Sequence, residues 1–90
     1  MARYFFNVYD GVDIIDDIGT ELADLEAVQL EAVKSAGEAI RELGPKFWES
    51  TDWRLMVFDD LGMHVLTLNF SGQSPYLGEL PSTTKPLQQN

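Results

Sequence analysis

Acidic side chains gather near the start of the chain, where their spacing raises the possibility of a divalent cation site. The group consists of Asp10, Asp13, Asp16, Asp17 and Glu21. Carboxylate oxygens are the ligands that Ca²⁺ and Mg²⁺ prefer, but this spacing does not reproduce the ligand positions of an EF-hand loop. Aspartate is also favoured in tight turns, where its side chain accepts backbone hydrogen bonds. We therefore expect turns here, with metal or small-ligand binding by this acidic hairpin as the alternative.

The single histidine is the other residue that suggests chemistry. His64 follows a turn that contains Asp59 and Asp60, and a histidine beside a carboxylate can act as a general base. No Ser, Thr or Lys stands at a recognisable catalytic spacing from it, and the chain has neither a glycine-rich phosphate loop nor a cysteine nucleophile. His64 is expected to be structural. The chain is predicted not to be an enzyme, with no catalytic residues, no cofactor and no metal.

The charge of the chain limits its partners. Fifteen acidic residues against six basic ones give a formal net charge of −9. Binding to nucleic acids and to anionic membranes depends largely on Lys and Arg, so neither is expected as a partner, although Arg3, Lys46 and Arg54 stand among aromatic residues. A protein partner or a second copy of the chain is favoured. The sequence shows neither a targeting segment nor an apolar stretch long enough to span a membrane, so a cytoplasmic location is expected.

Four strands are predicted from period-two alternation of apolar and polar residues. Asp10-Gly11 predicts a two-residue hairpin turn between the first two strands, because glycine adopts positive φ freely. A second turn around residues 59–62 joins the last two strands. The four segments are residues 3–9, 12–16, 53–58 and 63–70.

One helix is predicted between the two hairpins, over residues 25–43, where apolar residues recur every three or four positions. Asp24 is the expected N-cap, and Gly44 followed by Pro45 is the expected stop. The predicted fold is α+β, a two-layer ββαββ domain with a four-stranded antiparallel sheet and the helix on one face. Residues 1–71 form this domain. Residues 72–90 are predicted to be a flexible or loosely docked tail, in which Tyr76, Leu77 and Leu80 could anchor in a groove.

The alternation divides the apolar strand residues between the two faces of the sheet. One set is assigned to the face under the helix: Tyr4, Phe6, Val8, Leu55, Val57, Leu66, Leu68 and Phe70. The other set is left on the open face: Phe5, Tyr9, Met56, Phe58, Met63 and Val65.

An exposed apolar patch of this kind is unusual on a monomer. A second copy, a partner protein or the tail segment from Tyr76 to Leu80 could cover it. Alternatively, its side chains are only partly exposed and form a second cluster with Trp48 and Trp53. We predict a small, acidic, non-catalytic protein-interaction module that self-associates as a homodimer through this open face.

The motifs also resemble a known family. The stretch from Arg3 to Gly11, the acidic turn from Asp16 to Gly19 and the helix start Asp24-Leu25-Glu26-Ala27 are similar to a group of short alphaproteobacterial proteins. Its members share an arginine-tyrosine-phenylalanine-phenylalanine strand and an Asp-Gly turn. This family is a domain of unknown function, so the resemblance supports the fold and implies no catalytic residues.

Overall fold

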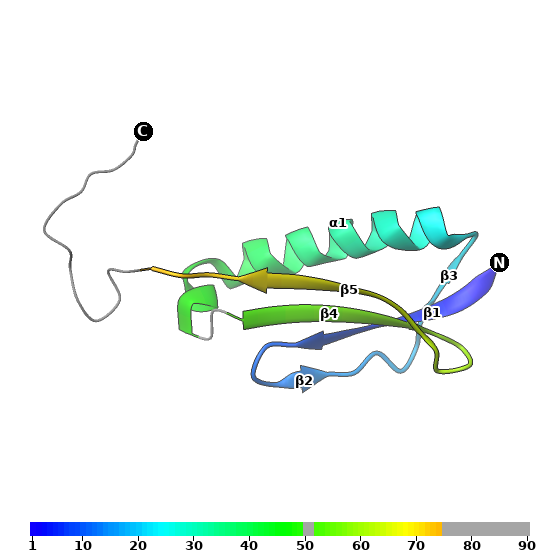
Figure 1. The fold of residues 1–90 in the computed structure, drawn as a ribbon, viewed down its shortest axis with the longest axis horizontal. Coiled ribbons are helices and arrows are strands. Elements are labelled where there is room, and N and C mark those ends of the chain that lie inside the picture. The colour runs from blue at the N-terminus through cyan, green and yellow to red at the C-terminus, as the bar shows by residue number, and fades with distance from the viewer. Residues whose placement is uncertain (50–51, 75–90) are drawn as a thin grey trace, which may run out of the picture.

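A computed structural model of the chain describes residues 1–49 and 52–74. Figure 1 shows a sheet with one long helix packed along it. The elements in chain order are β1 (Ala2–Tyr9), β2 (Asp13–Ile14), β3 (Thr20–Leu22), α1 (Leu25–Leu43), the 3₁₀ helix η1 (Gly44–Glu49), β4 (Asp52–Asp59) and β5 (His64–Ser71). The part of the predicted tail beyond Ser74, including Tyr76, Leu77 and Leu80, lies outside the described residues.

The sheet is antiparallel, with the strand order β2-β1-β4-β5 and with β3 paired to β1. The α+β class is confirmed, but the sheet formed by the described residues has five strands rather than the predicted four. The additional strand is Thr20–Leu22, which pairs with residues 2–4. Three residues are too few to show an alternating pattern in the sequence. The order along the chain is therefore βββαββ rather than ββαββ.

The first hairpin also differs from the prediction. Tyr9 pairs with Asp13 and Val8 with Ile14, so three residues, and not two, connect the strands. Gly11 supplies the positive φ of 94° that this connection requires. The partner strand is only two residues long because Ile15 and the residues after it leave the edge of β1, and β3 later resumes the pairing.

The helix begins and ends where the sequence predicted. The Asp24 carboxylate accepts a hydrogen bond from the Ala27 N–H at 2.9 Å, and the Gly44 N–H donates to the Ile40 carbonyl oxygen. Pro45 does not end all helical structure, because the chain continues as the 3₁₀ turn η1. Within the described part of the chain, no helix has the length and apolar character needed to cross a membrane.

The core lies between α1 and the two strands beneath it. Its fully buried side chains are Val28, Ala32, Ala36, Trp53, Leu55 and Val57. The small alanines allow the helix to approach the large residues of β4. The expected helix-side residues Tyr4, Phe6, Val8, Leu66 and Leu68 pack against this cluster. Phe70 is 37% exposed and contacts the edge of the Trp53 ring, with 5.6 Å between ring centroids.

The connection after the helix closes one end of the core. Phe47 packs against the buried cluster, and its ring lies edge-on to Trp48 at 5.7 Å between centroids. Gly72, just after β5, passes so close to these rings that a Cβ there would lie 2.7 Å from Trp48 Cζ3. The end of β5 is therefore held against η1.

Candidate interaction surface

The face of the sheet opposite α1, which we call the open face, carries aromatic side chains, methionine and arginine on neighbouring strands. Phe5 of β1 pairs with Phe58 of β4, and Phe58 also pairs with His64 of β5. The Phe58 and His64 rings lie 5.7 Å apart between centroids, edge to face. Cross-strand pairs of this kind bring side chains into contact on one face of a sheet. The strand register thus places a row of three rings across three strands.

A second row lies farther along the same face. Tyr9 pairs with Arg54, and the Arg54 guanidinium carbon stands 5.8 Å from the centre of the Tyr9 ring. Between the two rows, Met56 pairs with Asn7 on one side and with Thr67 on the other. The Asn7 amide donates to the Tyr9 hydroxyl at 3.3 Å. These contacts orient the Tyr9 and Arg54 side chains.

Four of the six predicted site residues therefore share this face: Phe5, Tyr9, Met56 and Phe58, all of them partly exposed. Met63 lies in the turn before β5, at the end of the sheet, and is 63% exposed. Val65 does not join them. A register shift after Val57 pairs Phe58 with His64, which makes Val65 an extra residue in β5, and its side chain packs against the core cluster.

The same bulge moves His64 to the open face, although simple alternation places it with Leu66 on the helix side. Its Nε2 lies 2.6 Å from the Thr67 hydroxyl. The alternative cluster with both tryptophans is contradicted, because Trp53 is 2% exposed in the core under α1. Arg54 was not predicted as a site residue. The sequence did indicate its position, because Arg54 stands two residues before Met56 and four before Phe58, and alternate residues of a strand lie on the same face.

The open face differs in charge from the rest of the chain. Of the 15 acidic residues, Asp52 alone occupies an open-face position on β1, β4 or β5. Arg3 and Arg54 occupy two further positions of the same face. The large negative charge of the protein therefore lies mainly on the helix, the turns and the β2–β3 edge.

One edge of this face is closed by the loop between β2 and β3. The Asp16 carboxylate accepts hydrogen bonds from the backbone N–H groups of Phe6, Ile18 and Gly19, at 3.0–3.1 Å. In return, the Asp16 N–H donates to Asn7 Oδ1 at 2.9 Å, and Asn7 is only 9% exposed. Asp16 therefore replaces the strand pairing that is missing between β2 and β3.

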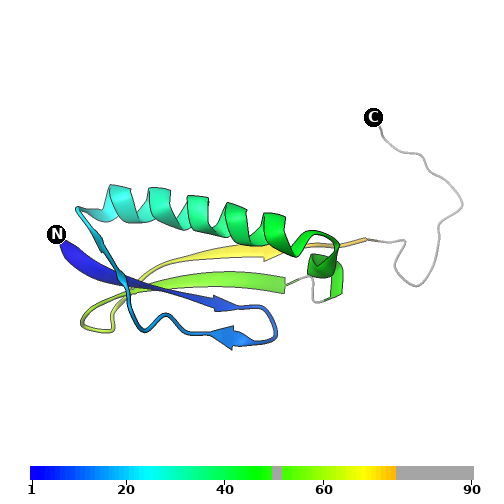
Figure 2. The same cartoon turned by 180° about the vertical axis from the view of Figure 1, so that it is seen from behind.

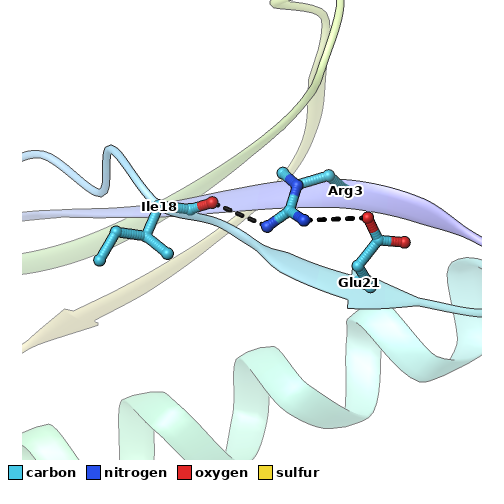
Figure 3. A network of polar contacts seen from close by, with 3 residues as sticks. All are labelled: Arg3, Ile18 and Glu21. Carbon is cyan, nitrogen blue, oxygen red and sulfur yellow. Dashed lines mark hydrogen bonds and ion pairs between the residues drawn. The ribbon is translucent and has the colours of Figure 1, made fainter.

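The Arg3 side chain, on the open face of the sheet, also holds this loop through hydrogen bonds. Figure 3 shows its guanidinium between two acceptors, the Ile18 carbonyl oxygen at 2.9 Å and the Glu21 carboxylate at 3.1 Å. Gly19 lies directly over the Arg3 and Phe5 side chains, with a positive φ of 82°. The loop thus covers the Arg3 end of the open face and leaves the Met56 region uncovered by it.

Asp16 is expected to stabilise the fold in its ionised form. Partial burial raises its pKa, but hydrogen bonds from the N–H groups of Gly19, Phe6 and Ile18 lower the pKa by more, so it lies below the ordinary 3.8. Asp16→Asn turns one acceptor into a donor that faces the Phe6 N–H. We expect a loss of about 1–3 kcal/mol in the free energy of unfolding at neutral pH.

The pH dependence follows from the direction of the shift. Because the folded pKa is lower than the unfolded one, the ionised Asp16 stabilises the fold fully above the ordinary value and loses this effect as the pH falls through the folded pKa. The difference between wild type and Asp16→Asn should therefore shrink between about pH 5 and pH 2. Urea denaturation across this range measures it, and a constant difference would contradict the assignment.

The carboxylates of the predicted acidic cluster do not point toward one common site. Asp16 is engaged by three backbone donors and Glu21 by Arg3, while Asp13 pairs across the hairpin with Tyr9. Within residues 1–49 and 52–74, no group of three His, Asp or Glu side chains is placed to hold a metal ion. The second turn uses aspartate in the same structural way, since Asp59 Oδ1 accepts from the Leu61 and Met63 N–H groups at 2.9 Å.

A groove lies on the other face of the sheet, beside the helix. It measures about 290 Å³ and separates Ala39, Glu42 and Leu43 of α1 from Val8 and Ile14. Figures 1 and 2 show the corresponding arrangement from two sides, with α1 along β5 and β4 and with β2 farther from it. The groove therefore shows which flank of the helix faces β1 and β2.

Comparison with known proteins gives one match. A family model described as "Domain of unknown function (DUF6894)" matches residues 3–71, which is more than half of the chain. The chain therefore belongs to this family, and the resemblance to a family of unknown function is confirmed. No curated protein and no solved structure matches.

Proposed function

From membership in a family without an assigned function, we propose that the protein is a small, non-catalytic protein-interaction module that self-associates through its open face. The observation that carries the proposal is the composition of that face: Phe5, Tyr9, Arg54, Met56 and Phe58 side by side on β1 and β4. Aromatic residues, methionine and arginine are the types enriched in protein interfaces, whereas Asp, Glu and Lys are depleted there. Tyr and Arg in particular are frequent among the residues that dominate binding energy.

The charge distribution favours a second copy as the partner on this face. Two proteins of net charge −9 repel each other, and the repulsion is smallest where the contact excludes their carboxylates. The centre of the open face is such a region, because β1, β4 and β5 carry one acidic residue there, Asp52, together with Arg3 and Arg54. The other two acidic strand positions of this face, Asp13 and Glu21, lie at its β2–β3 edge. A homodimer with the two open faces in contact keeps most carboxylates at the rim or beyond it.

Self-association through the open face can be tested by introducing a single charge at the centre of that face. Met56→Glu buries a carboxylate in the contact without a partner, so we expect the dissociation constant of self-association to rise at least about tenfold. Sedimentation equilibrium measures this as a lower mass at a given concentration. Leu61→Glu, at a turn residue that is 84% exposed, is the matched control and should keep the wild-type mass.

Two further results decide the proposal. Circular dichroism must show that Met56→Glu remains folded, since Met56 is partly buried. A folded Met56→Glu protein with the same mass as wild type and Leu61→Glu would contradict self-association through the open face.

The finer parts of the assignment rest on the sequence. We propose a cytoplasmic location, which a chain without cysteine fits, and an alphaproteobacterial origin, which the resemblance supports. The alternative of a metal or small ligand at the acidic hairpin has less support, because Asp16 and Glu21 already have hydrogen-bond donors within the chain.

A further inference from the structure

The two edges of the sheet are built differently. On one side, β2 and β3 are short and separated by a loop that carries Asp16 and Asp17, which are features that prevent another strand from pairing there. On the other side, β5 is eight residues long. It contains no Asp, Glu, Lys, Arg or Pro, and its bulge at Val65 lies near one end. The β5 edge therefore lacks the usual protection against strand addition.

The helix adds exposed apolar residues to the surface beside the β5 edge. Leu30 and Val33 of α1 are 71% and 60% exposed, although both are apolar. At about 100° per residue, Val33 lies about 180° around the helix from Glu42, which lines the groove toward β1 and β2. Gly37 lies within about 40° of Val33 on the same count. Val33 therefore lies on the β5 side of the helix, and Gly37 and Leu30 continue the apolar flank about 40° and 60° farther round, toward the outer surface of the helix.

Three of the four acidic residues of the helix are concentrated on the opposite flank. Glu31, Glu38 and Glu42 fall within about 40° of one another when projected down the helix axis. They face the same side as the groove between α1 and β1. The fourth, Glu26 in the first turn, projects within about 20° of Val33. A protein that approaches the β5 edge and the Leu30–Val33 flank therefore meets one helix carboxylate, near the N-terminus of α1, even though the chain as a whole is strongly acidic.

The surface is also self-complementary. Antiparallel pairing of two β5 strands about Thr67 places Leu66 opposite Leu68 of the other copy on the helix side, and Thr67 opposite its own equivalent on the open side. No like charges meet in this register.

The two helices fit as well. Because α1 lies over both β4 and β5, and strands are about 4.8 Å apart, each helix stands about 5 Å from the two-fold axis. The pair is then about 10 Å apart, which is a normal distance for packed helices. Gly37 has open space beside it, so it permits close approach.

We infer that the protein has a second self-contact, in which the β5 strands of two copies pair antiparallel and the Leu30–Val33–Gly37 flanks of their helices pack against each other. This contact is separate from the open face, and it extends the inference of self-association made above. Together the two contacts join more than two chains, while each alone gives a dimer.

The experiment compares the solution mass of four full-length proteins by sedimentation equilibrium. They are the wild type, Met56→Glu, the double variant Leu30→Glu/Val33→Glu and the protein with all three substitutions. Both helix positions are well exposed, so the fold should tolerate glutamate there. We expect more than two chains for the wild type, a dimer for Met56→Glu, a dimer for the double variant and a monomer for the triple variant.

Amide hydrogen exchange then tests the strand pairing itself. In the Met56→Glu dimer, the exchange of β5 amides that lack a partner on β4 should slow at least about tenfold when the protein concentration is raised through the association range. In the triple variant, the exchange rate of these β5 amides should not change with protein concentration. Protection confined to α1 would overturn the strand contact.

The failures of the two ideas are distinguishable. A folded but monomeric Met56→Glu protein overturns the β5 contact and leaves the open-face contact standing. A Met56→Glu protein with the wild-type mass, combined with a monomeric double variant, overturns self-association through the open face and supports the β5 contact. A monomeric wild type overturns both.

Discussion

Leu55→Ala is expected to lower the free energy of unfolding by about 2–5 kcal/mol. Leu55 is 1% exposed and lies on β4, the strand between β1 and β5, within the cluster formed with Val28, Ala32 and Ala36. Removing its side chain loses buried apolar surface and leaves a cavity under a helix that is already held close by alanines. The loss is a large share of the stability that a 90-residue domain possesses.

Thermal and urea denaturation measure this effect. The matched control is Leu61→Ala, the same substitution at a turn residue that is 84% exposed, where we expect a change within about 0.5 kcal/mol. Equal losses for the two variants would show that Leu55 is not enclosed by the helix and the sheet.

Gly19→Ala should destabilise the protein more than Gly11→Ala. Both glycines have a positive φ, 82° and 94°, so each substitution carries a backbone strain of about 1 kcal/mol. A Cβ on Gly11 meets nothing within 4 Å, whereas a Cβ on Gly19 would lie 2.7 Å from Arg3 Cγ and 2.9 Å from Phe5 Cε2. We expect a total loss of about 2–4 kcal/mol at Gly19.

The comparison of the two alanine variants separates the energetic cost of steric overlap at Gly19 from the cost of a positive φ, which both positions share. Chemical denaturation of both alanine variants gives the difference directly, since the backbone cost is common to both. The Gly19→Ala variant should also expose the Arg3 end of the open face, because the loop must move away from Phe5. Identical losses at the two positions would contradict the placement of the β2–β3 loop over the sheet.

The elements that the sequence predicted correctly are those with local signals. The helix has a capping aspartate at Asp24, a terminating glycine at Gly44 and an apolar stripe between them, and its observed bounds match the prediction. The long strands β1 and β4 alternate between the two faces of the sheet, and β5 does so after its bulge. Period two alone was therefore sufficient to place Phe5, Tyr9, Met56 and Phe58 on one face.

The features that the sequence did not predict depend on pairing between distant residues. Thr20–Leu22 becomes a strand because Asp16 and Asn7 hold the preceding loop against β1, and no periodic pattern marks so short a segment. Val65 moved to the core side because β5 contains one more residue than β4 across a bulge. A one-residue shift reverses the face of a side chain, and the sequence of a single strand contains no sign of it.

Self-association of the protein is expected to cover the open face. The most direct measurement is the oxidation rate of individual methionines, followed by mass spectrometry at protein concentrations below and above the association range. Met56 lies on the open face, whereas Met1 is 85% exposed at the N-terminus and acts as the internal reference. We predict that Met56 oxidises more slowly at high concentration while Met1 does not change. An unchanged Met56 rate across that range would contradict the claim.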